Sequence, residues 1–147
     1  MATDRAKMAT QFMKVLPFSS ALGMELVSID GTAAEISMPY DPAIVGDPDT
    51  GIVHGGAVSA LLDTVCGIAV FLQPDSDVPT ATIDLRIDYM RPAEPGKTIH
   101  ARAEVYHTTR SVAFLRAQAW TDDRNRLVAT GTGAFTFSKT SASDSTS

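Results

Sequence analysis

A single acid interrupts the most apolar stretch of the chain, residues 51–72, GIVHGGAVSALLDTVCGIAVFL. This acid is Asp63, and a carboxylate removed from water needs hydrogen-bond partners, because desolvation disfavours its charged form. At helical spacing, Ser59 and Gly67 lie four residues to either side of Asp63, and Cys66 lies three residues after it. Asp63 is therefore a candidate functional residue, and the alternative is that it caps or hydrogen-bonds a neighbouring strand.

The same stretch begins with His54-Gly55-Gly56, immediately before the apolar run. If a helix starts here, its first N–H groups have no internal partner and the positive end of the helix dipole lies beside them. Glycine allows a ligand to approach the backbone closely, so this turn could stabilise an oxyanion or polarise a carbonyl. A plain glycine turn into a helix is the alternative.

Helix geometry limits how these groups can work together. Asp63 follows Gly55 by eight residues, which corresponds to about 12 Å along a helix axis. One substrate carbon cannot reach both groups on one helix, and His54 would point to the opposite side from Asp63. Two helices packed antiparallel across a two-fold axis would place the amides of one opposite the acid of the other, so we expect a dimer.

The elements that must position these groups follow from periodicity and turn residues. A helix is expected over Asp4–Leu16, ended by Pro17, then a hairpin with its turn at Asp30-Gly31. The remaining ranges are strands 23–30 and 32–40, a loop over 41–51, the long helix 56–72, and strands 81–89, 99–105, 111–121 and 127–137. Strict alternation over 81–89 places Thr82 on one face with Asp84, Arg86 and Asp88. This order predicts an α+β fold in which an antiparallel sheet curls around the long helix.

Composition excludes several classes of protein. The chain has 147 residues, a net charge of −5 and a pI near 5.0, which argues against nucleic-acid binding. The apolar run is too short and too interrupted to cross a membrane. One cysteine fits a reducing cytoplasm. His54 and Asp63 lack metal-ligand spacing, so we expect no metal. We expect one domain over residues 1–139, with an N-terminal helix over 1–17, and a disordered tail over 140–147.

Two motifs, HGGAVSALLDTVCGIA and TATIDLRIDYMRPAEPG, resemble the hotdog-fold acyl-CoA thioesterases of the phenylacetate-degradation type. The resemblance extends from about Leu22 to Phe137. It implies a long helix wrapped by a curved antiparallel sheet, homodimers with a continuous sheet, tetramers built as dimers of dimers, and active sites at the dimer interface. It also implies that coenzyme A enters only as part of the substrate, with no other cofactor.

The resemblance assigns roles to four residues. Asp63 stands where these enzymes keep the catalytic carboxylate, which acts as general base or nucleophile. Gly55 stands where a backbone N–H polarises the thioester carbonyl, and His54 where a histidine orients the loop or contacts the thioester. Thr82 stands where a hydroxyl positions the attacking water.

This sequence differs from the family pattern at one position, and the resemblance also suggests residues that bind the substrate. Pro48 replaces a usual asparagine, and Asp47 or Asp49 could substitute for it only if the loop shifts. Arg110 and Arg91 are candidates for binding the coenzyme A phosphates, with solvated surface arginines as the alternative. The expected pocket residues are Gly56, Ser59, Leu62 and Cys66, with Leu61 and Val65 nearby.

These observations favour an enzyme that hydrolyses an aryl- or medium-chain acyl-CoA to the free acid and coenzyme A. A non-catalytic acyl-CoA-binding or sensing module is an alternative, motivated by Pro48. A hotdog-fold enoyl-CoA hydratase or dehydratase is another. Cys66 is set aside as a nucleophile because it lies inside the apolar helix.

Overall fold

The computed structural model describes residues 2–74, 76 and 79–138. The helices are α1 (Ala2–Val15), α2 (Pro17–Ala21) and α3 (Gly55–Phe71), with a 3-10 turn at Pro42–Ile44. The strands are β1 (Glu25–Asp30), β2 (Ala33–Met38), β3 (Thr82–Tyr89), β4 (Ile99–Thr108), β5 (Val112–Trp120) and β6 (Ala129–Thr136). The expected helices and strands are confirmed to within a few residues at each end, and the tail expected over 140–147 lies outside the described residues.

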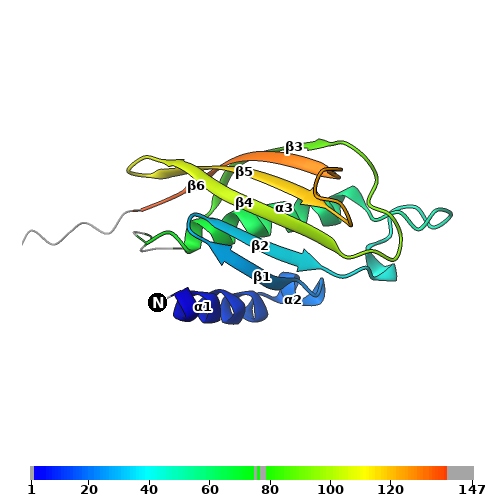
Figure 1. Ribbon diagram of the computed structural model, residues 1–147, viewed down its shortest axis with the longest axis horizontal. Helices are drawn as coiled ribbons and strands as arrows, with labels where there is room; N and C mark the ends of the chain where they lie inside the picture. The colour runs from blue at the N-terminus through cyan, green and yellow to red at the C-terminus, as the bar shows by residue number, and fades with distance from the viewer. Residues whose placement is uncertain (1, 75, 77–78, 139–147) are drawn as a thin grey trace, which may run out of the picture.

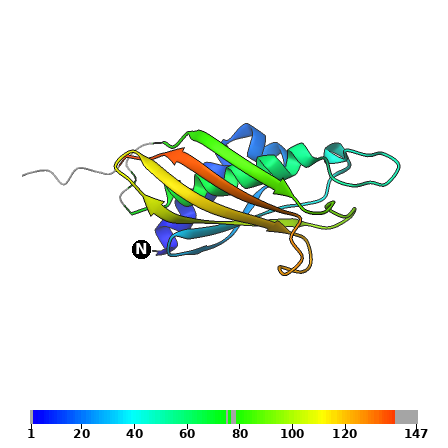
Figure 2. The same cartoon turned by 90° about the horizontal axis from the view of Figure 1, so that it is seen from above.

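The strands form one antiparallel sheet in the order β1-β2-β4-β5-β6-β3. The sheet curves around α3, with β1 and β3 at its opposite edges (Figure 1). Seen from above, α3 runs along the concave side of the sheet (Figure 2). The predicted α+β hotdog architecture is therefore confirmed.

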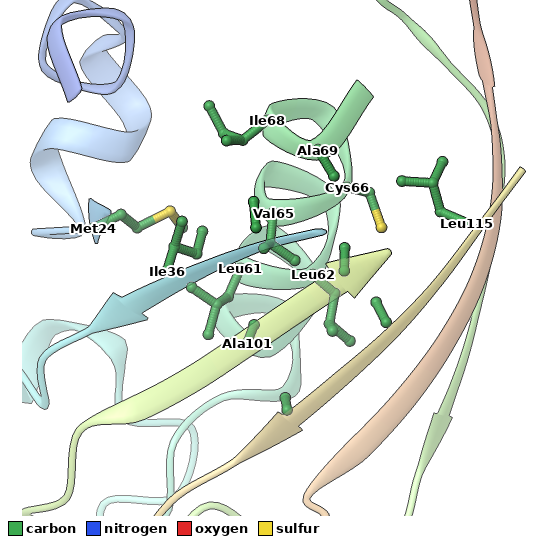
Figure 3. Packing of buried hydrophobic residues seen from close by; sticks show 14 of the residues in the cluster. Met24, Ile36, Leu61, Leu62, Val65, Cys66, Ile68, Ala69, Ala101 and Leu115 are labelled. Carbon is green, nitrogen blue, oxygen red and sulfur yellow. The ribbon is translucent and has the colours of Figure 1, made fainter. Parts of the chain in front are cut away.

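Small residues occupy part of the inner face of strands β4, β5 and β6, which gives α3 room to approach. The strands below the helix present Ala101, Ala103, Ala117, Ala119, Gly131 and Gly133. Larger side chains of α3 fill the space above them, including fully buried Leu61 and Val65 (Figure 3). Apolar contact over this surface stabilises the packing of α3 on the sheet. It also determines which face of α3 is left exposed to solvent.

The two edges of the sheet differ. The β1 edge is flanked by α1, which packs on β1 through buried Ala9 and Met13. Met8, Phe12 and Val15, the other large apolar side chains of α1, remain exposed. The β3 edge has no flanking strand or helix among the described residues.

Strand β3 contains a bulge that the alternation pattern did not predict. Thr82 pairs with Phe135 and Asp84 with the adjacent Ala134, so Ile83 is an extra residue. Since Phe135 is buried on the helix side, Thr82 also faces α3. The prediction that Thr82 shares a face with Asp84 was wrong, because a bulge shifts the two-residue period by one.

Among the helices that the structure describes, none has the length and apolarity needed to cross a membrane.

Candidate active site

Asp63 lies on the outer face of α3 and is exposed in the single chain. The expectation of a desolvated acid is therefore corrected, because the helix buries only the face that meets the sheet. Thr82 Oγ1 donates a hydrogen bond of 2.7 Å to Asp63 Oδ1. This bond fixes one carboxylate oxygen and leaves Oδ2 without a hydrogen-bond donor from the described residues. Thr82 and Asp63, two of the predicted catalytic residues, are thus brought together.

The first turn of α3 has one free amide. His54 is the N-cap, and its Nδ1 accepts a 2.8 Å hydrogen bond from the N–H of Gly56. Its carbonyl oxygen accepts from the N–H of Ala57 at 2.9 Å. Within the described part of the chain, the N–H of Gly55 donates to no acceptor, so it is available to an external oxygen.

The direction of this amide follows from the peptide plane. In a trans peptide the C=O of His54 and the N–H of Gly55 point in opposite directions, and no peptide of the described chain is cis. Since the C=O of His54 points into the helix to meet Ala57, the N–H of Gly55 points away from it. His54 thus holds the first turn of α3 through both its Nδ1 and its carbonyl oxygen.

Tyr89 is a site residue that the sequence did not reveal. Its hydroxyl donates a 3.0 Å hydrogen bond to the carbonyl oxygen of Gly55 and makes a short hydrogen bond with Ser59 Oγ. Tyr89 ends strand β3 on the same face as Leu85 and Ile87. A hydroxyl on an otherwise apolar strand face is the signal that could have identified it.

A cavity of about 410 Å³ opens beside Gly55 and Tyr89. Its walls are mainly apolar and come from the segment before α3, the start of α3, the end of β3 and the segments that follow β3 and precede β6. The remaining lining residues are Ile52, Val53, Val58, Met90, Arg91, Pro92, Ala93 and Val128. A cavity of this size and character suits an apolar group attached to a carbonyl at the Gly55 amide.

Gly55 and Asp63 belong to the same uninterrupted helix. Their separation along its axis is therefore about 12 Å, from the rise of an α-helix. The single chain does not bring the free amide and the acid to one reacting carbon, as helix geometry predicted.

Two of the expected pocket residues belong to the core instead. Leu62 and Cys66 are 0% exposed, and Figure 3 shows both directed from α3 toward the strands. Burial, and then the charge of Asp63, raise the pKa of the Cys66 thiol to about 12. The pocket assignment of these two residues is corrected accordingly, because both side chains are enclosed between α3 and the sheet. Gly56 and Ser59 do reach the surface.

The two candidate arginines lie at opposite ends of the sheet. Arg91 follows β3 at the Val128 end, whereas Arg110 is exposed in the β4–β5 turn near the start of β3. The Arg91 guanidinium donates twice to the carbonyl oxygen of Arg126, and also to Thr121, Glu94 and Pro92. These bonds occupy all its N–H donors, so the geometry does not favour the prediction that Arg91 binds phosphate.

Pro48 lies in a loop that is closed by its own hydrogen bonds. Asp47 Oδ1 accepts from the N–H of Asp49, and Oδ2 accepts from Thr50 Oγ1 at 2.7 Å. These bonds, led by that from Thr50, lower the pKa of Asp47 below its ordinary value. Asp47 is thus engaged within the loop and does not replace the missing asparagine.

Comparisons with known proteins agree with this geometry. A family model described as Thioesterase superfamily matches residues 50–128. Medium/long-chain acyl-CoA thioesterase YigI of Salmonella typhimurium is 28% identical over 126 residues, which cover 77% of this chain and 81% of that protein.

Solved structures extend the likeness over more of the chain. A crystal structure of a Pseudomonas aeruginosa protein is 40% identical with a TM-score of 0.80, covering 90% of this chain and 98% of that one. The E. coli PaaI protein from the phenylacetic acid degradation operon has a TM-score of 0.80 at 22% identity, over 93% and 96% of the two chains, which shows the shared fold. The resemblance inferred from the two motifs is confirmed: this chain belongs to the thioesterase superfamily and is a thioester hydrolase.

Proposed function

We propose that the protein hydrolyses an aryl- or medium-chain acyl-CoA to the free acid and coenzyme A. The observation that carries this proposal is the exposed Asp63 carboxylate, which accepts a hydrogen bond from Thr82 of β3. Asp63 lies on the same helix, α3, that presents the free Gly55 amide. A carboxylate can take the proton of an attacking water, and an N–H can stabilise the oxyanion that forms.

In the proposed reaction, Asp63 takes the proton of the attacking water and the Gly55 N–H stabilises the oxyanion. Water attacks the thioester carbon while Asp63 Oδ2 accepts its proton, and the carbonyl oxygen becomes an oxyanion on the Gly55 N–H. Collapse of this intermediate breaks the C–S bond, and coenzyme A leaves as the thiol after taking back the proton that Asp63 accepted from water, which regenerates the carboxylate. Direct attack by Asp63, which would form a mixed anhydride and release the coenzyme A thiolate, is the other route. Appearance of ¹⁸O on Asp63 after a single turnover in ¹⁸O-water would identify it, because water would then have attacked the Asp63 carbonyl of that anhydride.

The two groups meet when two chains combine. Because β1 is flanked by α1, the open β3 edge is the edge on which a second sheet can continue. This edge exposes Ile83, Tyr89 and Met90, three large apolar side chains. In the proposed homodimer, Asp63 of one chain faces Gly55 of the other, and two dimers combine into a tetramer.

The remaining parts of the proposal concern the substrate and its location. Coenzyme A is part of the substrate, not a resident cofactor, and its phosphates lie on Arg110. The cavity beside Gly55 is mainly apolar, and YigI is named for medium- and long-chain acyl-CoA, which supports an apolar acyl group. One cysteine and a pI near 5.0 fit a cytoplasmic protein.

The test is a substrate panel assayed for thiol release, with benzoyl-, phenylacetyl-, hexanoyl-, octanoyl-, acetyl- and palmitoyl-CoA. We expect the first four to give the highest kcat/KM, and Asp63→Asn to lower kcat at least 100-fold. Glu104→Gln is the matched control, since Glu104 is an exposed acid on the outer face of β4. Full turnover by Asp63→Asn would remove the proposed base.

Two further measurements complete the test. Arg110→Ala is expected to raise KM for acyl-CoA but not for the same acyl group on N-acetylcysteamine, which has no phosphates. Light scattering gives the mass in solution, and a monomer at assay concentration would contradict the shared site.

A further inference from the structure

Tyr89 and Ser59 form a hydrogen-bonded pair behind the free amide. Tyr89 Oη donates to the carbonyl oxygen of Gly55 at 3.0 Å, and Ser59 Oγ lies 3.2 Å from the same oxygen. The two hydroxyls also contact each other. Both protons are used if Ser59 donates to Tyr89 and Tyr89 donates to Gly55.

We propose that Tyr89, assisted by Ser59, is a positioning residue that aims the N–H of Gly55 at the thioester oxygen. This inference rests on the proposed acyl-CoA hydrolysis and adds a residue to its machinery.

Gly55 needs such an anchor because glycine has no preferred backbone conformation. The peptide before it is held by the C=O of His54, which accepts from Ala57. The peptide after it is held at both ends: its N–H donates to His54 Nδ1, and its C=O accepts from Tyr89. With both flanking planes fixed, the direction of the Gly55 N–H is fixed as well.

The anchor comes from the strand that also holds the acid. Thr82 begins β3 and binds Asp63, while Tyr89 ends β3 and binds Gly55. One strand therefore sets the position of both reacting groups of α3. A site held to a fraction of an ångström by such support reacts faster than one left to move.

The hydroxyl has a role separate from that of the ring. The Tyr89 ring lines the cavity beside Gly55 and lies 3.5 Å from where a Cβ on Gly55 would stand. Tyr89→Phe keeps this ring and removes only the hydrogen bond. A lining role alone predicts no change in this variant, whereas a positioning role predicts a lower kcat.

The experiment compares Tyr89→Phe with Tyr106→Phe. Tyr106 lies on β4, where the Arg116 guanidinium packs over its ring. We expect kcat to fall about ten-fold in Tyr89→Phe, with KM within two-fold and an unchanged melting temperature. Tyr106→Phe should match the wild type. Ser59→Ala should lose part of the activity, and Ser59→Thr should recover most of it, because threonine keeps the hydroxyl.

A readout independent of turnover is the hydrogen exchange of the Gly56 amide, which should become faster in Tyr89→Phe. If Asp63→Asn abolishes turnover while Tyr89→Phe behaves like Tyr106→Phe, the inference fails and the proposed function stands. If the wild type hydrolyses no acyl-CoA, the proposed function fails, and the Gly56 exchange rate alone decides whether Tyr89 positions the turn. Unchanged exchange would overturn the inference.

Discussion

Thr82 and Tyr89 lie seven residues apart on β3, yet both point to the helix side of the sheet. In a regular strand an odd separation puts two side chains on opposite faces. The extra residue Ile83 brings the two side chains to the same face. Their partners on β6, Phe135 and Ala129, are six residues apart and so share a face. The bulge thereby allows one edge strand to hold both Asp63 and Gly55.

The first prediction concerns the Thr82 hydroxyl. Thr82→Val should lower kcat about ten-fold, because a hydrogen bond to a charged group contributes about 1.5 kcal/mol or more. Thr82→Ser keeps the hydroxyl and should retain most of the turnover. Steady-state kinetics with one acyl-CoA measures both variants, and equal loss in the two would show that the methyl group matters rather than the hydroxyl.

The second prediction isolates the free amide. Gly55→Pro removes its N–H at the first position of α3, where proline is favoured. His54 already has the extended backbone that proline requires before it, with φ −60 and ψ 132. The fold should persist while kcat falls about 100-fold.

The matched variant at this site is Gly55→Ala, which keeps the N–H and makes only ordinary contacts with Tyr89. It should lose much less activity than Gly55→Pro. Circular dichroism checks that both variants fold. Similar kinetics for the two would mean that the amide does not act on the substrate.

Sequence patterns predicted the fold well because burial follows periodicity. The long helix, the Asp30-Gly31 hairpin and the strands follow from local signals that tertiary packing reinforces. The bulge at Ile83 escaped prediction because it depends on the register between β3 and β6, which are distant in sequence.

The site was predicted only in part, for the same reason. The residues around the start of α3 could be identified, since a helix start has unpaired amides wherever it occurs. Tyr89 could not, because its partner Gly55 is 34 residues away. The structural role of Arg91 depends likewise on the Arg126 carbonyl, 35 residues along the chain.

The third prediction follows from that role. Arg91→Ala should lower the free energy of unfolding by about 2 kcal/mol, because it leaves the Arg126 carbonyl and Thr121 without their donor. Arg110→Ala is the control, since Arg110 is exposed and should change stability by less than about 0.5 kcal/mol. Urea unfolding measures the stability of both variants. Equal stability of Arg91→Ala and Arg110→Ala would contradict a structural role for the Arg91 hydrogen bonds.

The fourth prediction uses the one cysteine. With its pKa raised to about 12 by burial, the Cys66 thiol is protonated at pH 8 and enclosed by the core. It should therefore fail to react with Ellman's reagent in the folded protein and react fully in denaturant, one thiol per chain. Rapid reaction of the folded protein would show that this part of α3 opens.

The fifth prediction tests the central claim that each site combines the Gly55 amide of one chain with Asp63 of another. Asp63→Asn and Gly55→Pro chains, each nearly inactive alone, are refolded together in equal amounts. If the site is shared, half of the dimers are mixed and each contains one intact site, so activity should recover to about a quarter of the wild-type value. If both groups act from one chain, every site in the mixture carries a defect, and activity that stays at the level of the separate variants would contradict the account.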